Sequence, residues 1–221
     1  MREGTPITAT LEHVVFLPTS SAKNFPSVIA LHGRGTDEYD LVPVVLALEI
    51  PELLLISPRA PYNFPYGGHA WYHLGQEGVP EPESFRSSLG LLHKFIDEVK
   101  GGYPVDPERL FLLGFSQGTM MAYATALANP RAFGGVVALS GYVPIGSKLP
   151  LQLTGLAGFP VFISHGSNDA IIPPRYGSES AKLLTEAGAD VSYHEYSMGH
   201  EIREETLRDI RKWFQKILKP G

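Results

Sequence analysis

The 221-residue chain contains no cysteine, which excludes a disulfide framework, a thiolate metal site and a cysteine nucleophile. No apolar run approaches the roughly 20 residues that a membrane span needs. Basic residues are not in excess either: 18 Lys and Arg against 23 Asp and Glu leave a net charge of −5, so nucleic acid is not an expected partner. Since the first residues also lack the apolar core of a signal peptide, we expect a cytoplasmic protein.

Cofactor-binding motifs are missing as well. The histidines are scattered without an HExxH pattern, and there is neither a Walker loop nor a GxGxxG motif, so we expect no metal and no cofactor. The 23 glycines and 19 prolines are dispersed, which indicates many turns rather than low complexity. The length fits one domain over residues 1–221. The oligomeric state stays open, a homodimer included.

Short apolar runs alternate with helical patterns along the chain. Strands are predicted at residues 13–17, 27–31, 53–57, 110–113, 136–140, 161–164 and 191–196. Helices are predicted at residues 37–48 after a Thr36 N-cap, 84–99, 118–128, 178–187 and 201–218. Such alternation predicts an α/β fold with a mostly parallel sheet, helices on both faces and no cap domain.

Two strands and two loops stand out in this pattern. The strand at 27–31 is apolar on both sides and is expected at the centre of the sheet, whereas the alternating strand at 191–196 is expected nearer an edge. Segments 58–82 and 142–160 are irregular but rich in residues that prefer burial, so we interpret them as elaborated loops of the same domain.

The motif Gly114-Phe115-Ser116-Gln117-Gly118 lies between a predicted strand and a predicted helix. That context is typical of a nucleophile elbow, in which a serine projects from a strained turn between two small residues. The helix N-terminus also favours developing negative charge near Ser116. We therefore predict Ser116 as a catalytic nucleophile.

A serine nucleophile needs a base, and the base needs an orienting acid. Asp169 follows the strand at 161–164 and His200 follows the strand at 191–196, in the order that this architecture uses. A turn role for Asp169 and a capping role for His200 are the structural alternatives. Other candidates, which we consider weaker, are His165, His194, His69 and His73 for the base and Glu179 for the acid.

Acyl transfer also needs two N–H donors for the oxyanion. The segment His32-Gly33-Arg34-Gly35 directly follows the central strand, and its glycines allow the Arg34 N–H to turn inward. The second donor is predicted to be the Gln117 N–H, next to the nucleophile. A tight turn into a helix is the alternative. For substrate contacts the candidates are Phe64, Trp71, Tyr72 and Met198.

The segments LHGRG, AWY, GFSQG, HGSND and SMGHEI together resemble the phospholipase/carboxylesterase family of α/β-hydrolases, from about Ser27 to Leu218. The resemblance implies hydrolysis of carboxylic esters or thioesters by the triad Ser116, Asp169 and His200, with Arg34 and Gln117 in the oxyanion hole. Relatives commonly carry an apolar residue where this chain has Arg34, so we expect substrate choice to differ. A relative of the dienelactone hydrolases, with serine in place of cysteine, is a further alternative.

The function predicted from these residues is hydrolysis of a small-to-medium, moderately apolar ester through an acyl-enzyme. Acyl-thioesterase or lysophospholipase activity is the nearest alternative. A low-turnover ligand receptor on the same fold is a second, because fold alone does not determine function. A serine peptidase or amidase is a third, although no extra domain is evident that would select peptides.

Overall fold

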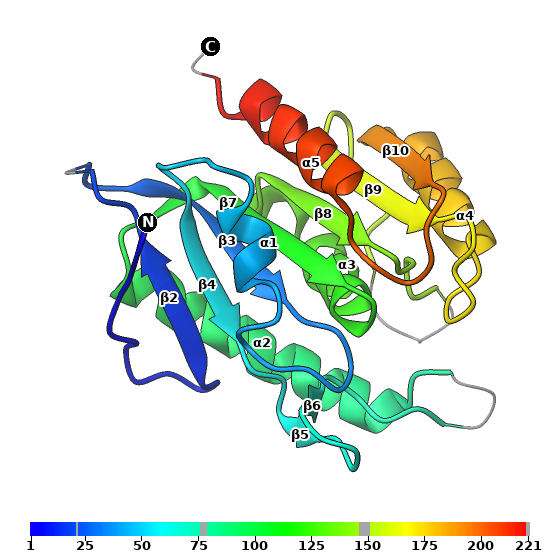
Figure 1. Ribbon diagram of the computed structural model, residues 1–221, viewed down its shortest axis with the longest axis horizontal. Coiled ribbons are helices and arrows are strands. Elements are labelled where there is room, and N and C mark those ends of the chain that lie inside the picture. Colours follow the sequence, from blue (N-terminus) through cyan, green and yellow to red (C-terminus); the bar gives the residue numbers. More distant parts are fainter. Residues whose placement is uncertain (21, 76–78, 146–150, 220–221) are drawn as a thin grey trace.

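A computed structural model describes residues 1–20, 22–75, 79–145 and 151–219 (Figure 1). Eight strands form one sheet in the order β1-β2-β4-β3-β7-β8-β9-β10. β2 pairs antiparallel with β1 and β4, and all the other neighbours in this sheet are parallel. The strands are β1 (Arg2–Glu3), β2 (His13–Leu17), β3 (Phe25–Leu31), β4 (Leu54–Pro58), β7 (Val105–Phe115), β8 (Gly135–Leu139), β9 (Pro160–Gly166) and β10 (Asp190–Tyr196).

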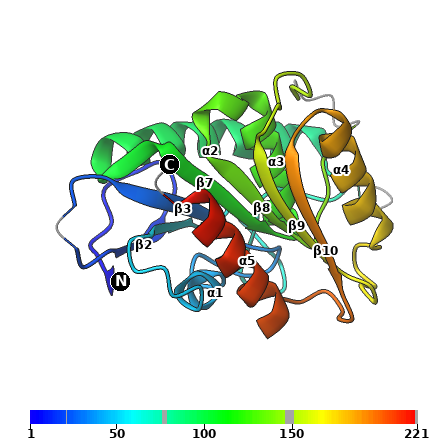
Figure 2. The same cartoon turned by 90° about the horizontal axis from the view of Figure 1, so that it is seen from above.

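Helices cover both faces of this sheet (Figure 2). The helices are α1 (Val42–Leu46), α2 (Pro82–Gly102), α3 (Gln117–Ala128), α4 (Arg175–Glu186) and α5 (Glu204–Ile217), with a short 3₁₀ helix at Pro130–Ala132. One apolar core lies between the sheet and α2, α3 and α4, and a second lies between the sheet and α1 and α5. This is the α/β-hydrolase architecture without a cap domain in the described residues. None of the described helices is long and apolar enough to span a membrane.

All seven predicted strands are present, although β7 begins at Val105, five residues earlier than predicted. β3 is fourth of the eight strands and buried along its whole length, as its apolar run indicates. β10 is an edge strand, and most of its residues are only half buried. The helices at 84–99, 118–128, 178–187 and 201–218 are also confirmed, with ends that differ by at most three residues.

The predicted helix at 37–48 is much shorter than expected, and its predicted N-cap is wrong. α1 is limited to Val42–Leu46, and its N-cap position is Leu41, without a side-chain cap. Pro43 explains the late start, because it lies in the first turn of α1, where its missing N–H is not needed. A helix from residue 37 would place Pro43 in its interior, where proline removes a hydrogen bond and its ring clashes with the carbonyl group four residues earlier. The Thr36 hydroxyl instead lies 3.0 Å from the Gly33 carbonyl oxygen.

The aromatic segment at 58–82 is partly ordered into its own small hairpin. β5 (Tyr62–Asn63) pairs antiparallel with β6 (His69–Ala70) in a separate two-stranded sheet. Residues 76–78 of this segment and 146–150 of the segment at 142–160 lie outside the described residues. The hairpin stands below the carboxyl ends of β3 and β4 in Figure 1 and contributes to the site described next.

Candidate active site

The site forms where the parallel strands end. Because parallel strands share one direction, the segments that follow them meet at one edge of the sheet. β3 ends at Leu31 before the HGRG segment, and β7 ends at Phe115 before Ser116. Asp169 and His200 follow the ends of β9 and β10. Residues more than 160 positions apart in the chain are thereby brought to one place.

Ser116 occupies a strained turn between β7 and α3. Its backbone has φ 52° and ψ −120°, a conformation that non-glycine residues rarely adopt. The turn is compact: a Cβ atom on Gly118 would lie 1.9 Å from the Leu31 carbonyl oxygen, and one on Gly114 would lie 2.4 Å from the Gly118 oxygen. Both glycines are therefore needed for the strand and the helix to approach this closely. The predicted role of small residues around Ser116 is confirmed.

Asp169 and His200 are joined directly. His200 Nδ1 lies 2.7 Å from Asp169 Oδ2, and the Asp169 side chain has no exposed surface while that of His200 is 17% exposed. The other carboxylate oxygen, Oδ1, accepts hydrogen bonds from the backbone N–H groups of Ile171 and Ile172, each 2.9 Å long. The carboxylate is thus fully buried, hydrogen-bonded and aimed at one nitrogen of His200.

The imidazole of His200 lies beside the nucleophile turn. Its ring packs against Phe115, the neighbour of Ser116, with 4.9 Å between ring centroids. No hydrogen bond joins the Ser116 hydroxyl to His200 within the described part of the chain. Such contacts often tighten only when substrate binds. The close approach of the two loops depends on Gly166, since a Cβ atom there would lie 2.2 Å from the Gly199 oxygen.

His165 supports the loop that carries Asp169. Its Nε2 atom lies 2.8 Å from the Ile172 carbonyl oxygen and 3.4 Å from Asp169 Oδ2, and the side chain is fully buried. Since a carbonyl oxygen only accepts, Nε2 carries the proton. Nδ1 has no hydrogen-bond partner among the described residues. The weaker base candidate from the sequence therefore holds the segment that orients Asp169.

His32 orients the segment that was predicted to supply an oxyanion donor. The Ala60 N–H donates to His32 Nε2 at 3.0 Å, so the ring proton sits on Nδ1, which donates to the Gly33 oxygen at 2.6 Å. Burial lowers the pKa of His32, which keeps the ring neutral. The Gly33 carbonyl and the Arg34 N–H belong to one trans peptide and point in opposite directions, so this bond sets the direction of the Arg34 N–H.

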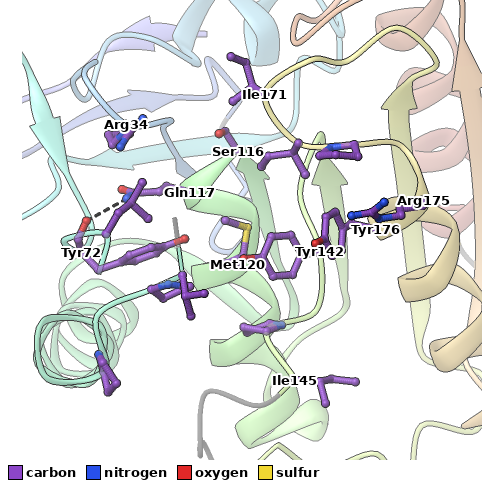
Figure 3. Close-up of a pocket in the computed structure, with 17 residues that line it drawn as sticks. Arg34, Tyr72, Ser116, Gln117, Met120, Tyr142, Ile145, Ile171, Arg175 and Tyr176 are labelled. Atoms are coloured by element: carbon purple, nitrogen blue, oxygen red, sulfur yellow. Dashed lines mark hydrogen bonds between the residues drawn. The ribbon is translucent and has the colours of Figure 1, made fainter. Parts of the chain in front are cut away.

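Gln117 links the nucleophile turn to the aromatic segment. Its side-chain oxygen accepts a hydrogen bond from the backbone N–H of Trp71, and its side-chain nitrogen donates to the backbone oxygen of Tyr72. Both bonds are 2.9 Å long, and the bond to Tyr72 is dashed in Figure 3. Trp71 in turn donates its indole N–H to the His32 oxygen at 3.0 Å. Neither the Gln117 nor the Arg34 backbone N–H donates to another described residue. Both remain available to a ligand.

A cavity of about 680 Å³ opens beside Ser116 (Figure 3). Its walls come from the turn at 116–120, the aromatic segment, and the segments that follow β8 and β9. Most of the lining is apolar or aromatic. The described lining residues are Arg34, Tyr72, Leu74, Val79, Pro80, Pro82, Ser116, Gln117, Met120, Tyr142, Pro144, Ile145, Ile171, Ile172, Pro173, Arg175 and Tyr176.

Of the four predicted substrate contacts, Tyr72 lines this cavity. Trp71 and Met198 are outside the lining and almost wholly buried. Trp71 is hydrogen-bonded to the HGRG segment, and Met198 belongs to the loop that carries His200, with its sulfur against the Thr206 hydroxyl. Phe64 also lies outside the lining, with its ring beneath the guanidinium of Arg34. The structure places these three around the site rather than in the cavity wall.

The remaining candidates from the sequence have other surroundings. His194 in β10 stacks on Phe162 of the neighbouring strand β9, and Glu179 is exposed on α4. His69 belongs to β6, where its backbone bonds to residues 35 and 36, and His73 packs against Tyr62. Among the described residues no cluster of His, Asp and Glu side chains could hold a metal ion.

Sequence reasoning missed part of the cavity wall. Tyr142 lies at the start of a segment that was predicted only as a loop, and Met120 lies on the α3 face turned toward the cavity. Arg175 and Tyr176 belong to the first turn of α4, and no local pattern marks them. The aromatic character of Tyr142 and Tyr176, whose ring centroids lie 5.2 Å apart, is the one signal that could have pointed to a wall.

Known proteins share this sequence along most of its length. The family model described as Phospholipase/Carboxylesterase matches residues 13–218. A probable carboxylesterase of Oryza sativa is 28% identical over 219 residues, covering 92% of this chain and 82% of the relative. Acyl-protein thioesterase 1 of Candida albicans is 26% identical, covering 92% of this chain and 96% of the relative.

Solved structures agree with these sequence matches. The carboxylesterase of Bacillus cereus has a TM-score of 0.82 and 27% identity, covering 94% of this chain and 95% of that chain. A carboxylesterase from Mesorhizobium loti, at 21% identity, shares the fold with a TM-score of 0.84, covering 97% and 99% of the two chains. The chain therefore belongs to the phospholipase/carboxylesterase family and is a serine hydrolase of carboxylic esters with the α/β-hydrolase fold.

Proposed function

We propose that the protein hydrolyses small-to-medium carboxylic esters through the triad Ser116, Asp169 and His200. The observation that carries the proposal is the 2.7 Å contact between His200 Nδ1 and the buried carboxylate of Asp169, at the edge of the sheet where Ser116 occupies its strained turn. A carboxylate in that position holds the imidazole with its proton on Nδ1 and leaves Nε2 free to accept a proton.

In the first half of the reaction, His200 Nε2 takes the hydroxyl proton as Ser116 Oγ attacks the ester carbonyl. The carbonyl oxygen becomes an oxyanion, for which the N–H groups of Arg34 and Gln117 are the donors. Each such donor is worth roughly 3–4 kcal/mol in the transition state. The tetrahedral intermediate then collapses, the bond to the alcohol oxygen breaks, and the protonated His200 gives its proton to the leaving alcohol.

In the second half, His200 removes a proton from a water molecule that attacks the acyl-enzyme. A second oxyanion forms in the same place and collapses to the carboxylic acid, and the proton returns to Ser116. The chemistry uses only these side chains, two backbone N–H groups and water. We further propose that the chain acts as one domain, since one sheet carries all three residues.

The cavity supports the choice of substrate size. A volume of about 680 Å³ lies within the range of sites for small molecules, and its aromatic and aliphatic walls favour an apolar acyl or alcohol group. Thioester hydrolysis is the second candidate, because relatives such as that of Candida albicans are named acyl-protein thioesterases. The same triad cleaves either bond, so matched oxygen and sulfur esters of one acid distinguish the two.

The experiment that tests the proposal is labelling with a fluorophosphonate, followed by mapping of the adduct by mass spectrometry. We expect one stoichiometric adduct on Ser116, and none in the folded variant Ser116→Ala. Turnover of 4-nitrophenyl butyrate is expected to fall by several orders of magnitude in the same variant. An adduct on another serine would overturn the site. A folded protein that neither reacts nor turns over any ester would favour the receptor alternative.

A further inference from the structure

The cavity beside Ser116 has an unusual balance of charge for this chain. The whole sequence carries a net charge of −5. The described lining of the cavity nevertheless contains two arginines, Arg34 and Arg175, and no aspartate or glutamate. Figure 3 shows the two arginines on opposite sides of Ser116. An acidic protein thus presents positive charge where its substrate binds.

Aromatic rings, rather than carboxylates, hold these two guanidinium groups. The Arg34 guanidinium lies over the Phe64 ring at 5.2 Å from its centroid, and that of Arg175 lies over the Tyr176 ring at 5.0 Å. Such contacts orient a guanidinium without neutralising its charge. Neither arginine forms an ion pair with a described carboxylate, unlike Arg59, whose Nη2 lies 2.5 Å from Glu38. Arg175 also makes a side-chain hydrogen bond to Tyr176 and interacts with Glu179, one turn further along α4. The Arg34 guanidinium donates to no described residue, so its hydrogen-bond donors remain open to an anion.

The apolar surroundings strengthen the attraction between these two guanidinium groups and an anion. Apolar side chains from three separate segments, including Leu74, Ile145 and Ile171, line the same cavity as the two arginines. A ligand that fills the cavity displaces water, and the attraction between a guanidinium and an anion grows as water is excluded. Arg34 is also the residue whose backbone N–H we propose as an oxyanion donor. Its side chain is attached to the Cα atom next to that nitrogen and therefore starts close to the reacting carbonyl.

We infer that the site prefers esters that carry an anionic group, which Arg34 binds within reach of the scissile carbonyl and which Arg175 attracts from the other side of the cavity. A carboxylate or phosphate group fits, because either accepts two parallel hydrogen bonds from one guanidinium. This inference rests on the proposed function, since it concerns the substrate of the same site. It adds a charge requirement that an apolar cavity alone would not impose.

Matched esters test the inference. The anionic probe on the acyl side is 4-nitrophenyl hemiglutarate, with 4-nitrophenyl pentanoate as its neutral partner. The anionic probe on the alcohol side is 4-carboxyphenyl butyrate, with phenyl butyrate as its neutral partner. For at least one pair we expect a higher kcat/KM for the anionic ester, through a lower KM, and a preference that shrinks as salt is added.

Substitution of the arginines provides the second measurement. In Arg34→Gln the ratio of kcat/KM for the preferred anionic ester to that for its neutral partner is expected to fall about 10- to 100-fold, the range for a hydrogen bond to a charged group. A smaller fall in the same ratio is expected for Arg175→Gln. The matched control is Arg131→Gln: Arg131 is exposed on the 3₁₀ helix and outside the cavity, so its removal leaves the ratio unchanged.

Three results would contradict the inference, and they differ in what they say of the proposed function. If the wild-type protein hydrolyses the neutral esters through Ser116 but disfavours both anionic probes, the charge preference is refuted and the proposed function stands. The same holds if Arg34→Gln lowers the rates of anionic and neutral esters equally. If no ester is hydrolysed and Ser116 is not labelled, the proposed function falls and the inference falls with it.

Discussion

Replacing Gly118 by alanine would test how tightly the nucleophile turn is packed. The new methyl group would lie 1.9 Å from the Leu31 oxygen and 2.7 Å from the His32 oxygen, and both are backbone atoms that no rotamer change can move. The two segments would have to separate by about 1.5 Å to bring the 1.9 Å approach to the 3.4 Å of an ordinary contact. Overpacking of this kind costs roughly 1–3 kcal/mol, and we expect the upper end because the obstacle is backbone. For a chain of this length, 3 kcal/mol lowers Tm by about 6–12 °C.

The same substitution at Gly90 is the control. Gly90 also lies within a helix, α2, but it is exposed and nothing lies within 4 Å of an added Cβ atom. Alanine has the higher helix propensity, so Gly90→Ala is expected to raise the free energy of unfolding by about 0.5–1 kcal/mol. In thermal and urea unfolding we therefore expect Gly118→Ala to lower the stability and Gly90→Ala to raise it, although the chemical change is the same.

Activity gives an independent measurement on the same variant. A shift of α3 away from β3 moves Ser116 relative to the Arg34 N–H, and a displacement of about 1 Å costs on the order of 100-fold in rate. We expect that loss in kcat for Gly118→Ala at a temperature where the variant is still folded, and no loss for Gly90→Ala. Wild-type stability and turnover in Gly118→Ala would refute the packing argument for the turn.

Three further substitutions probe other parts of the structure. Asp169→Asn is expected to lower kcat about 10⁴-fold with the fold retained, through the wrong histidine tautomer, and a loss below tenfold in steady-state assays would remove Asp169 from its role. Backbone N–H groups in the first turn of α2 lower the pKa of Glu81 from 4.5 to about 2. The contribution of Glu81 to stability is therefore present above pH 4.5 and lost as the pH falls toward 2. In urea unfolding, Glu81→Gln is expected to lose this part of the pH dependence, and an unchanged profile would contradict the argument. Gln117→Ala leaves the backbone N–H of Trp71 and the backbone oxygen of Tyr72 unpaired, and is expected to lower the free energy of unfolding by roughly 2–4 kcal/mol. For Gln152→Ala, at an exposed site, the change is expected to stay within about 0.5 kcal/mol. Equal effects of the two substitutions on unfolding would show that the Gln117 link is not needed.

The predictable part of the fold is the part in which local pattern and burial agree. β3 and β8 are apolar runs with no competing interpretation, and α2 shows a 3.6-residue stripe that starts after its Glu81 cap. α1 could not be bounded from periodicity, because residues 38–41 form turns and the helix begins only at Val42. The preference of a residue for a helix does not determine whether tertiary contacts allow one.

The hydrogen bonds that support the site could not be predicted from the sequence, for a related reason. Gln117 was predicted for its backbone N–H, but its side chain also bonds to residues 45 and 46 positions earlier in the chain. His32 and His165 carry no local mark that distinguishes them from surface histidines. Only their burial against the Gly33 and Ile172 oxygens shows that each holds a loop of the site.

The sequence by itself determined the strand–helix alternation, the family and the order of Ser116, Asp169 and His200, because these depend on residue type and on separation along the chain. Tertiary structure alone decided which side chains surround the cavity, including the placement of Arg34 and Arg175 on either side of Ser116. These two residues are 141 positions apart, and no local preference determines their separation in space. It follows from the parallel pairing of β3, β7, β8 and β9, which brings the ends of distant strands to one edge of the sheet.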